Sequence, residues 1–131
     1  FRHIEAELYA YHDTKKEIKK LREQIIHSSY VDENTGQGKN SHRTPGRPTE
    51  IIATRLTTDK RLRNLEEIVE AIDGVYEQVT ETHQKMIRLK YWSNKNLTWQ
   101  RVADECHVHP NTMTKMRREV IYLVADKIGW R

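Results

Sequence analysis

The chain has 131 residues, enough for one domain or one domain with an appended arm, and its net charge is +4. Its single cysteine excludes a disulfide within the chain, and no stretch approaches the roughly 18–20 consecutive apolar residues that a membrane-spanning helix needs. The opening residues, FRHIEAELY, place acids among the apolar residues, unlike a signal peptide, so a cytosolic protein is the simplest expectation.

The positive charge is concentrated in two parts of the chain. Lysine and arginine outnumber aspartate and glutamate in residues 36–61 and 80–131, whereas residues 62–79 hold five carboxylates and one arginine. A basic middle segment and a basic C-terminal third form the kind of footprint that a nucleic-acid ligand requires.

Residues 1–28 have the pattern of an N-terminal helical segment. Their apolar residues fall on two stripes, Ile4, Leu8 and Tyr11, then Ile18, Leu21 and Ile25. Thr14 and Glu17 have the spacing of a capping box, so we expect a break near residues 12–14. The lysines and arginine of residues 15–22 make the second piece basic, which is typical of a solvated face and also of contact with DNA phosphates.

Residues 29–48 are predicted to be a flexible basic arm or loop. The sequence SSYVDENTGQGKNSHRTPGRP has few apolar residues and many Gly, Asn, Ser and Pro. Arg43 and Arg47 flank a Pro-Gly pair and are similar to the arginines that enter narrow A·T-rich minor grooves. The segment is therefore either a plain tether or an arm that contacts DNA.

Residues 49–79 are predicted to form the central helices, used for packing or dimerisation. Thr49 is expected to cap a short helix that leads into a longer one from about Asp59 to Gln78. The longer helix has an apolar seam: Leu62, Leu65, Ile68, Val69, Ile72, Val75 and Tyr76. Its opposite face is acidic and should point away from DNA, as a solvated surface or as a contact for RNA polymerase or the basic arm.

Residues 80–131 are predicted to be a helix-turn-helix DNA-binding domain. Thr80 can start its first helix, whose core residues are Met86, Ile87, Leu89 and Tyr91. Trp92, Leu97 and Trp99 are expected to form one cluster at the floor of this domain. The last helix continues its apolar stripe past Arg118 and should end at Gly129 as a C-cap residue.

The stretch from Leu97 to Arg118 carries the helix-turn-helix pattern. Its apolar residues are spaced for two short helices across a tight turn: Val102 and Cys106, Met113 and Met116, with Val108 at the corner and Ala103 at the closest approach. Thr98 suits the cap of the first helix, and Pro110 suits the first position of the second. A helical hairpin with a solvated basic face is the alternative.

The second of these helices has the composition of a recognition helix, with no acid between Pro110 and Arg118. Candidates for contact with base edges are His109, Asn111, Thr112, Thr114, Lys115 and Arg118. Candidates for contact with the DNA backbone are Arg88, Lys95, Thr98, Gln100, Arg101 and Arg117.

The sequence gives little support for catalysis or for a cofactor. Cys106, His107 and His109 could be zinc ligands, but Cys106 is needed in the apolar corner and no second pair has the usual spacing. No glycine-rich loop or Ser/His/Asp arrangement is present either. We therefore expect neither a metal nor an enzyme.

The residues from Thr82 to Val108 resemble a known family. MIRLKYW, LTWQRVADE and HV are similar to the fourth region of bacterial primary sigma factors, in which an arginine-rich helix precedes a helix-turn-helix that reads promoter DNA. With the opening FRHIEAELYAYHDTKKEIKKLREQI, the central TDKRLRNLEEIVEAIDGVY and the closing VIYLVADKIGWR, nearly the whole chain resembles the RinA/ArpU-type transcriptional regulators of phages and prophages of Gram-positive bacteria. His107 stands where glycine is common and His109 where serine is common, so we expect the second helix to lack a good cap.

These patterns together predict an all-α helical bundle that binds double-stranded DNA and regulates transcription. The resemblance implies an activator of late phage genes, such as those for packaging and morphogenesis, that recruits RNA polymerase at the nucleoid of a bacterial host cell, with repression as the other direction of regulation. A homodimer is expected, because such proteins usually read two half-sites about one helical turn apart. A viral packaging subunit of the small-terminase kind and a sigma-like polymerase-binding factor are the competing functions.

Overall fold

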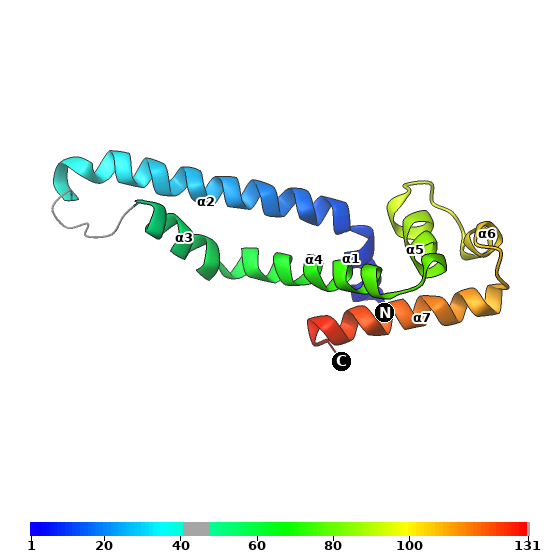
Figure 1. Ribbon diagram of the computed structural model, residues 1–131. Coiled ribbons are helices and arrows are strands. Elements are labelled where there is room, and N and C mark those ends of the chain that lie inside the picture. The colour runs from blue at the N-terminus through cyan, green and yellow to red at the C-terminus, as the bar shows by residue number, and fades with distance from the viewer. Residues whose placement is uncertain (41–47, 131) are drawn as a thin grey trace. The chain divides into compact units, whose positions relative to one another are not determined.

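The computed structural model describes the backbone of residues 1–40 and 48–130 and the side chains of residues 1–28 and 49–130. All the regular secondary structure in these residues is helical (Figure 1), which confirms the predicted all-α fold. The elements are α1 (Arg2–Tyr9), α2 (Tyr11–Asn40), α3 (Pro48–Thr58), α4 (Lys60–Gln78), α5 (Glu81–Ile87), the π-helix η2 (Arg88–Trp92), α6 (Trp99–Glu105) and α7 (Pro110–Ile128). None of the described helices is both long and apolar enough to cross a membrane.

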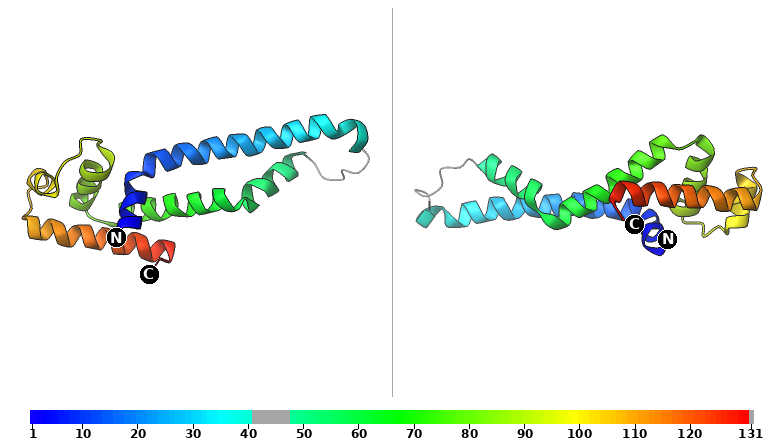
Figure 2. Two further views of the ribbon diagram at one scale, coloured as in Figure 1. Left: turned by 180° about the vertical axis from the view of Figure 1, so that it is seen from behind. Right: turned by 90° about the horizontal axis from the view of Figure 1, so that it is seen from below.

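The chain divides into two compact units. Unit 1 consists of Phe1–Asp13 and Glu67–Arg131, and unit 2 consists of Thr14–Glu66. In unit 1, α1 lies against α7 and η2, and α6 packs against both η2 and α7 (Figure 2). The first helix of the chain is therefore part of the unit that holds the predicted helix-turn-helix.

The core of unit 1 is built from every one of its helices. Its most deeply buried side chains are Leu8 of α1, Ile72 and Val75 of α4, Met86 and Ile87 of α5, Val102 of α6, and Met113, Val120, Ile121 and Val124 of α7. Burial of one such side chain stabilises a fold by about 1.5–3 kcal/mol. Because α7 contributes more of them than any other helix, its apolar face is fixed inside the unit and its other face is turned outward.

The apolar seam predicted on α4 is confirmed. Leu62, Val69, Ile72 and Val75 are buried, and Leu65, Ile68 and Tyr76 are half-buried. The helix begins one residue later than predicted, because Asp59 is its cap: the Asp59 carboxylate accepts a hydrogen bond from the Leu62 N–H at 2.8 Å. Since these side chains are packed against other residues of the same chain, the seam is not available to a second subunit.

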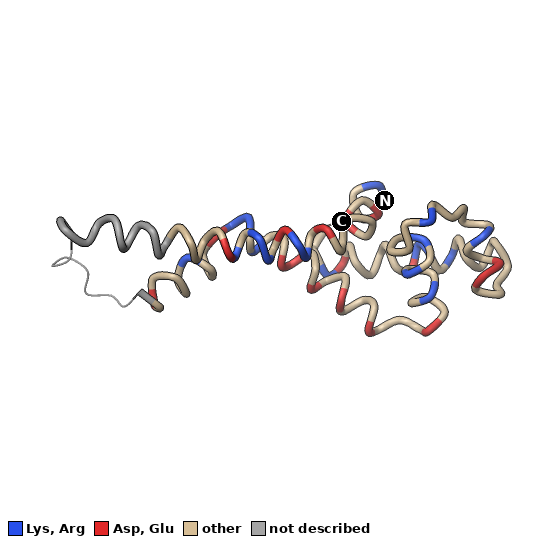
Figure 3. The backbone as a smooth tube through the Cα atoms, turned by 90° about the horizontal axis from the view of Figure 1, so that it is seen from above, with Lys and Arg blue, Asp and Glu red and all other residues tan. Residues whose placement is uncertain are grey.

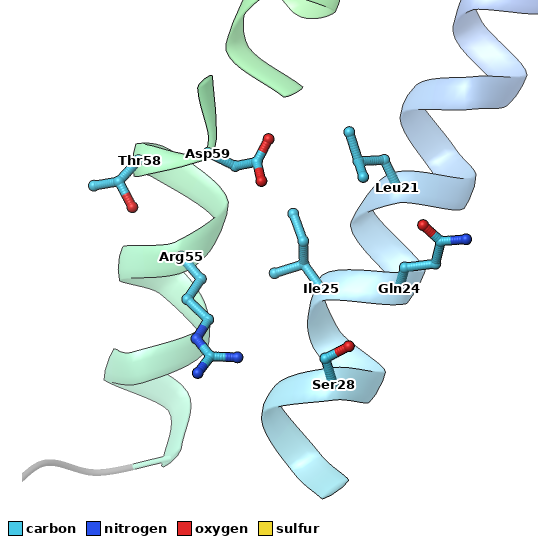
Figure 4. Close-up of a pocket in the computed structure, with 7 residues that line it drawn as sticks. All are labelled: Leu21, Gln24, Ile25, Ser28, Arg55, Thr58 and Asp59. Carbon is cyan, nitrogen blue, oxygen red and sulfur yellow. The ribbon is translucent and has the colours of Figure 1, made fainter. Parts of the chain in front are cut away.

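Unit 2 brings the first half of α2 beside α3 and the start of α4. Glu17 of α2 accepts a hydrogen bond from Arg61 of α4 at 2.9 Å, and Arg22 forms an ion pair with Glu66. An open pocket of about 400 Å³ lies between α2 and α3, with Leu21 and Ile25 on one side and Arg55 on the other (Figure 4). The pairs are exposed, so they contribute little to stability.

The N-terminal helix breaks earlier than the capping-box pattern predicted. α1 ends at Tyr9 and α2 starts at Tyr11, so the break is at Ala10, and Thr14 lies inside α2. The break brings Tyr11 into the core, where its ring stacks on Trp92 with centroids 4.6 Å apart and its hydroxyl donates to Asp73. These tertiary contacts decide the position of the break, and the local capping pattern does not.

The loop predicted from residue 29 was wrong over its first part. The α2 helix continues to Asn40, and α3 already begins at Pro48, so Thr49 lies inside α3 and is not its cap. Glycine costs a helix only about 1 kcal/mol relative to alanine, so the glycines of this stretch did not end the helix. The predicted minor-groove residues Arg43 and Arg47 lie outside the described residues.

Candidate nucleic-acid interface

The first helix of the helix-turn-helix is capped as predicted. The Thr98 hydroxyl accepts a hydrogen bond from the Arg101 N–H at 3.2 Å, and α6 then runs from Trp99 to Glu105. Val102 and Ala103 are fully buried, so this short helix is held by its apolar side against η2 and α7.

The turn between α6 and α7 requires a left-handed residue. His107 occupies that position with φ = 58°, where glycine is favoured because a side chain is strained there. Cys106 is buried, as the apolar pattern predicted, and the Val108 N–H donates to the Ala103 carbonyl at 3.0 Å. The histidine therefore keeps the tight turn, at the cost of some backbone strain.

The expectation that His109 leaves α7 without a cap was wrong. His109 is the N-cap residue, and its Nδ1 accepts a hydrogen bond from the Asn111 N–H at 3.0 Å. A neutral imidazole that accepts at Nδ1 carries its proton on Nε2. The exposed ring of His109 therefore presents an N–H donor outward while it caps the helix.

The outward face of α7 carries the residues predicted to read bases. Asn111, Lys115 and Arg118 recur at steps of four and three, so they share one stripe, and all three are exposed. Within the described part of the chain, none of their side chains makes a hydrogen bond or an ion pair. Thr112 and Thr114 flank the stripe, and the Thr114 hydroxyl donates to the Pro110 carbonyl at 3.1 Å.

Apart from Arg117, the residues predicted to contact phosphates are exposed. Arg88 donates to the Tyr76 hydroxyl, and Arg101 pairs with Glu105 at 3.4 Å on the surface of α6. Lys95 lies in the loop before α6 and Gln100 lies in its first turn, both exposed. Figure 3 marks lysine and arginine in blue and aspartate and glutamate in red along the backbone.

Arg117, which was predicted to contact the DNA backbone, is bound to other residues inside unit 1. Its guanidinium donates from Nε to Glu5 Oε2 at 3.0 Å and from Nη2 to Glu5 Oε1 at 2.6 Å. It also lies over the ring of Trp99, with Cζ 4.9 Å from the centroid. These contacts occupy Arg117 inside unit 1, so we remove it from the phosphate-contacting residues.

Glu5 is the residue that sequence reasoning missed. It also accepts a hydrogen bond from the Tyr91 hydroxyl at 2.8 Å, so one carboxylate joins α1, η2 and α7. Burial acts to raise the pKa of Glu5, but the hydrogen bonds from Arg117 and Tyr91 and the charge of Arg117 outweigh it and hold the pKa below 4.5. No local spacing could have revealed a partner so far along the chain.

The comparisons with known proteins give the family. The family model described as "Protein of unknown function (DUF722)" matches residues 6–126, from the middle of α1 to near the end of α7. The chain belongs to the DUF722 family. Neither the curated proteins nor the solved structures contain a match to it.

In this DUF722 protein the tryptophans form two clusters, whereas the sequence predicted one. Trp92 stacks on Tyr11 and Tyr76, and its Nε1 donates to the Leu8 carbonyl at 3.1 Å. Trp99 instead meets Tyr91 edge to face, with centroids 5.8 Å apart. The first cluster joins α1, α2 and α4 to η2, and the second supports α6.

Glu119 is the first carboxylate of α7 and lies next to the base-reading stripe. Its Oε2 is 3.3 Å from Nε2 of His83, a half-buried residue of α5 whose Nδ1 lies 2.6 Å from the Thr80 hydroxyl. This contact places the acid beside α5.

The predicted zinc alternative has no geometric support. Within the described residues, no group of three or more His, Cys, Asp or Glu side chains is placed to hold a metal ion. Cys106 is buried in the corner, and this burial raises the pKa of its thiol, so the reactive thiolate is disfavoured.

Proposed function

We propose that this DUF722 protein binds double-stranded DNA in a sequence-specific manner and regulates transcription. The observation that carries the proposal is the outward face of α7, where Asn111, Lys115 and Arg118 are exposed, unpaired within the described residues and not interrupted by a carboxylate. An amide, an ammonium and a guanidinium are the groups that hydrogen-bond adenine and guanine edges in the major groove.

The base contacts begin at the N-terminal end of α7. Asn111 is suited to adenine, and Lys115 and Arg118 are suited to guanine O6 and N7. The Nε2–H of His109 and the hydroxyl of Thr112 lie next to them and serve as closer or water-mediated contacts. Thr114 is a weaker candidate, because its hydroxyl donates within its own helix.

The register of the recognition helix on the duplex is set by contacts to phosphates. Lys95 lies in the loop before α6, Gln100 and Arg101 lie in the first turn of α6, and Arg88 lies in η2; all four are exposed and can contact phosphate oxygens. Thr98 contributes the cap that orders these groups.

The biological setting follows from the sequence resemblance. We propose an activator of late phage or prophage genes that recruits host RNA polymerase and binds as a homodimer. The acidic face of α4 is turned to solvent at Glu67, Glu70 and Glu77, which supports the expectation that this helix lies away from phosphate.

The test is selection of bound duplexes from a random pool, followed by substitution on α7. We expect a defined motif, and we expect Arg118→Ala to weaken binding to it by about 1–3 kcal/mol while relaxing base preference. The matched control is Lys127→Ala, an exposed cation of the same helix on its opposite side. An unchanged motif and affinity for Arg118→Ala would show that α7 does not read DNA.

A further inference from the structure

Tyr122 continues the base-reading stripe of α7. It follows Asn111, Lys115 and Arg118 at steps of four, three and four residues, so the four side chains lie on one line along the helix. Its side chain is 61% exposed, more than any other large hydrophobic residue of the described chain. Its hydroxyl makes no hydrogen bond to any described residue, so this donor is available to a ligand.

The position of Tyr122 places it beyond the bases when α7 occupies the groove. At about 1.5 Å per residue, the stripe from Asn111 to Tyr122 is about 16 Å long, whereas the major groove is about 12 Å wide. Recognition helices contact base edges mainly with their N-terminal residues. Tyr122, about 6 Å further along the axis than Arg118, therefore reaches the level of the sugar–phosphate backbone.

The ring of Tyr122 is held in position by a neighbouring aromatic residue. Phe1 meets it edge to face, with centroids 5.6 Å apart and an interplanar angle of 64°. The next residue of the stripe is Asp126, an exposed acid that phosphate would repel. The stripe therefore changes from hydrogen-bond donors to a carboxylate immediately after Tyr122.

We propose that the Tyr122 hydroxyl donates a hydrogen bond to a DNA phosphate at the edge of the major groove and so fixes how far α7 is inserted. This inference rests on the proposed function, because it requires α7 to lie in the groove. This contact depends on the position of the sugar–phosphate backbone and does not distinguish one base sequence from another.

The experiment compares Tyr122→Phe with the unmodified protein on the selected duplex. Removal of the hydroxyl should weaken binding by on the order of tenfold, because a hydrogen bond to a charged phosphate oxygen is lost. The loss should be the same on unrelated duplexes, and the selected motif should not change. The matched control is Tyr9→Phe, a half-exposed tyrosine of α1 that lies outside the stripe and should bind as the unmodified protein does.

Salt dependence and modified DNA distinguish this contact from the others. Tyr122→Phe should leave the slope of log K against log salt unchanged, because a neutral hydroxyl releases no counterion, whereas Arg101→Ala should reduce it by about 0.9. Replacing single phosphates by methylphosphonates should reveal one position at which the unmodified protein loses affinity and Tyr122→Phe loses none.

The results that would overturn the phosphate contact differ from those that would overturn the proposed function. Equal affinity of Tyr122→Phe and the unmodified protein, or a changed base preference, overturns the phosphate contact. If Lys115→Ala and Arg118→Ala still relax the motif in that case, the proposed function stands. If the unmodified protein binds no duplex, both the function and this contact are wrong.

Discussion

The carboxylate of Glu5 links α1 to η2 through Tyr91 and to α7 through Arg117. Its pKa is lowered in the folded protein, so the stability it contributes is present above the pKa of the unfolded chain and is lost as the pH falls through the folded value. The position of α7 therefore depends on the ionised form of a residue near the start of the chain.

We predict that Glu5→Gln reduces the free energy of unfolding at pH 7. Hydrogen bonds to charged groups contribute about 1.5–3 kcal/mol, and the partial exposure of Arg117 places the loss at the lower end of that range. The difference between the two proteins should shrink as the pH falls through the lowered pKa of the folded carboxyl, because Glu5 of the unmodified protein is then protonated as well. Urea titrations at several pH values measure it, and a difference that is constant with pH contradicts the role given to Glu5.

His109 has two functions that substitution can separate. His109→Ala removes the cap of α7 and should destabilise the protein by about 1 kcal/mol, whereas His109→Ser restores a capping oxygen. Neither variant keeps the outward Nε2–H donor. If that donor contacts DNA, the serine variant recovers the melting temperature and does not recover the affinity. Full recovery of both by serine shows that the ring is only a cap.

At the scale of elements, two glycines should respond in opposite ways to alanine. Gly129 ends α7 with φ = 89°, so Gly129→Ala should destabilise by about 1 kcal/mol through backbone strain. Gly74 lies inside α4, and a Cβ there would be 3.4 Å from the mobile end of Lys127, so Gly74→Ala should stabilise by up to about 1 kcal/mol. Thermal unfolding of the two variants tests both signs, and a destabilised Gly74→Ala would show that α4 and α7 are closer than described.

The elements that the sequence predicted well are those specified by neighbouring residues. The caps at Thr80 and Thr98, the first-turn Pro110 and the terminal Gly129 are all observed, because a cap needs only a few consecutive residues. The break at Ala10 could not be predicted, because it depends on contacts of Tyr11 with distant residues.

The placement of the candidate site residues could be predicted to a similar degree and for the same reason. The exposure of Asn111, Lys115 and Arg118 follows from helical periodicity around Met113 and Met116, which the sequence displays. Arg117 directly precedes Arg118 in the sequence, but its side chain binds Glu5. This pairing could be recognised only from the fold.

At the scale of the whole molecule, the proposed homodimer requires a surface at which two copies of the chain associate. Of the two seams predicted for dimerisation, the one on α4 is buried within the chain, since Ile72 and Val75 are each 1% exposed. The seam of α2 is more accessible: Ile18, Leu21 and Ile25 are half-buried and Ile26 is 42% exposed. Unit 2 is therefore the better candidate for the interface between subunits.

We predict a dimer in solution whose association depends on this face of α2. Replacing Ile26 with glutamate should weaken association, because an unpaired charge at an apolar contact is poorly tolerated, and should leave folding intact because the residue is exposed. Sedimentation equilibrium over a range of concentrations measures the mass of both proteins, with Glu23→Ala on the same helix as a control for surface substitution. A large ring would favour the packaging subunit instead, and a monomer that binds core polymerase tightly and DNA weakly would favour the sigma-like factor. If the protein is a dimer and Ile26→Glu does not weaken it, the two subunits meet somewhere other than this face.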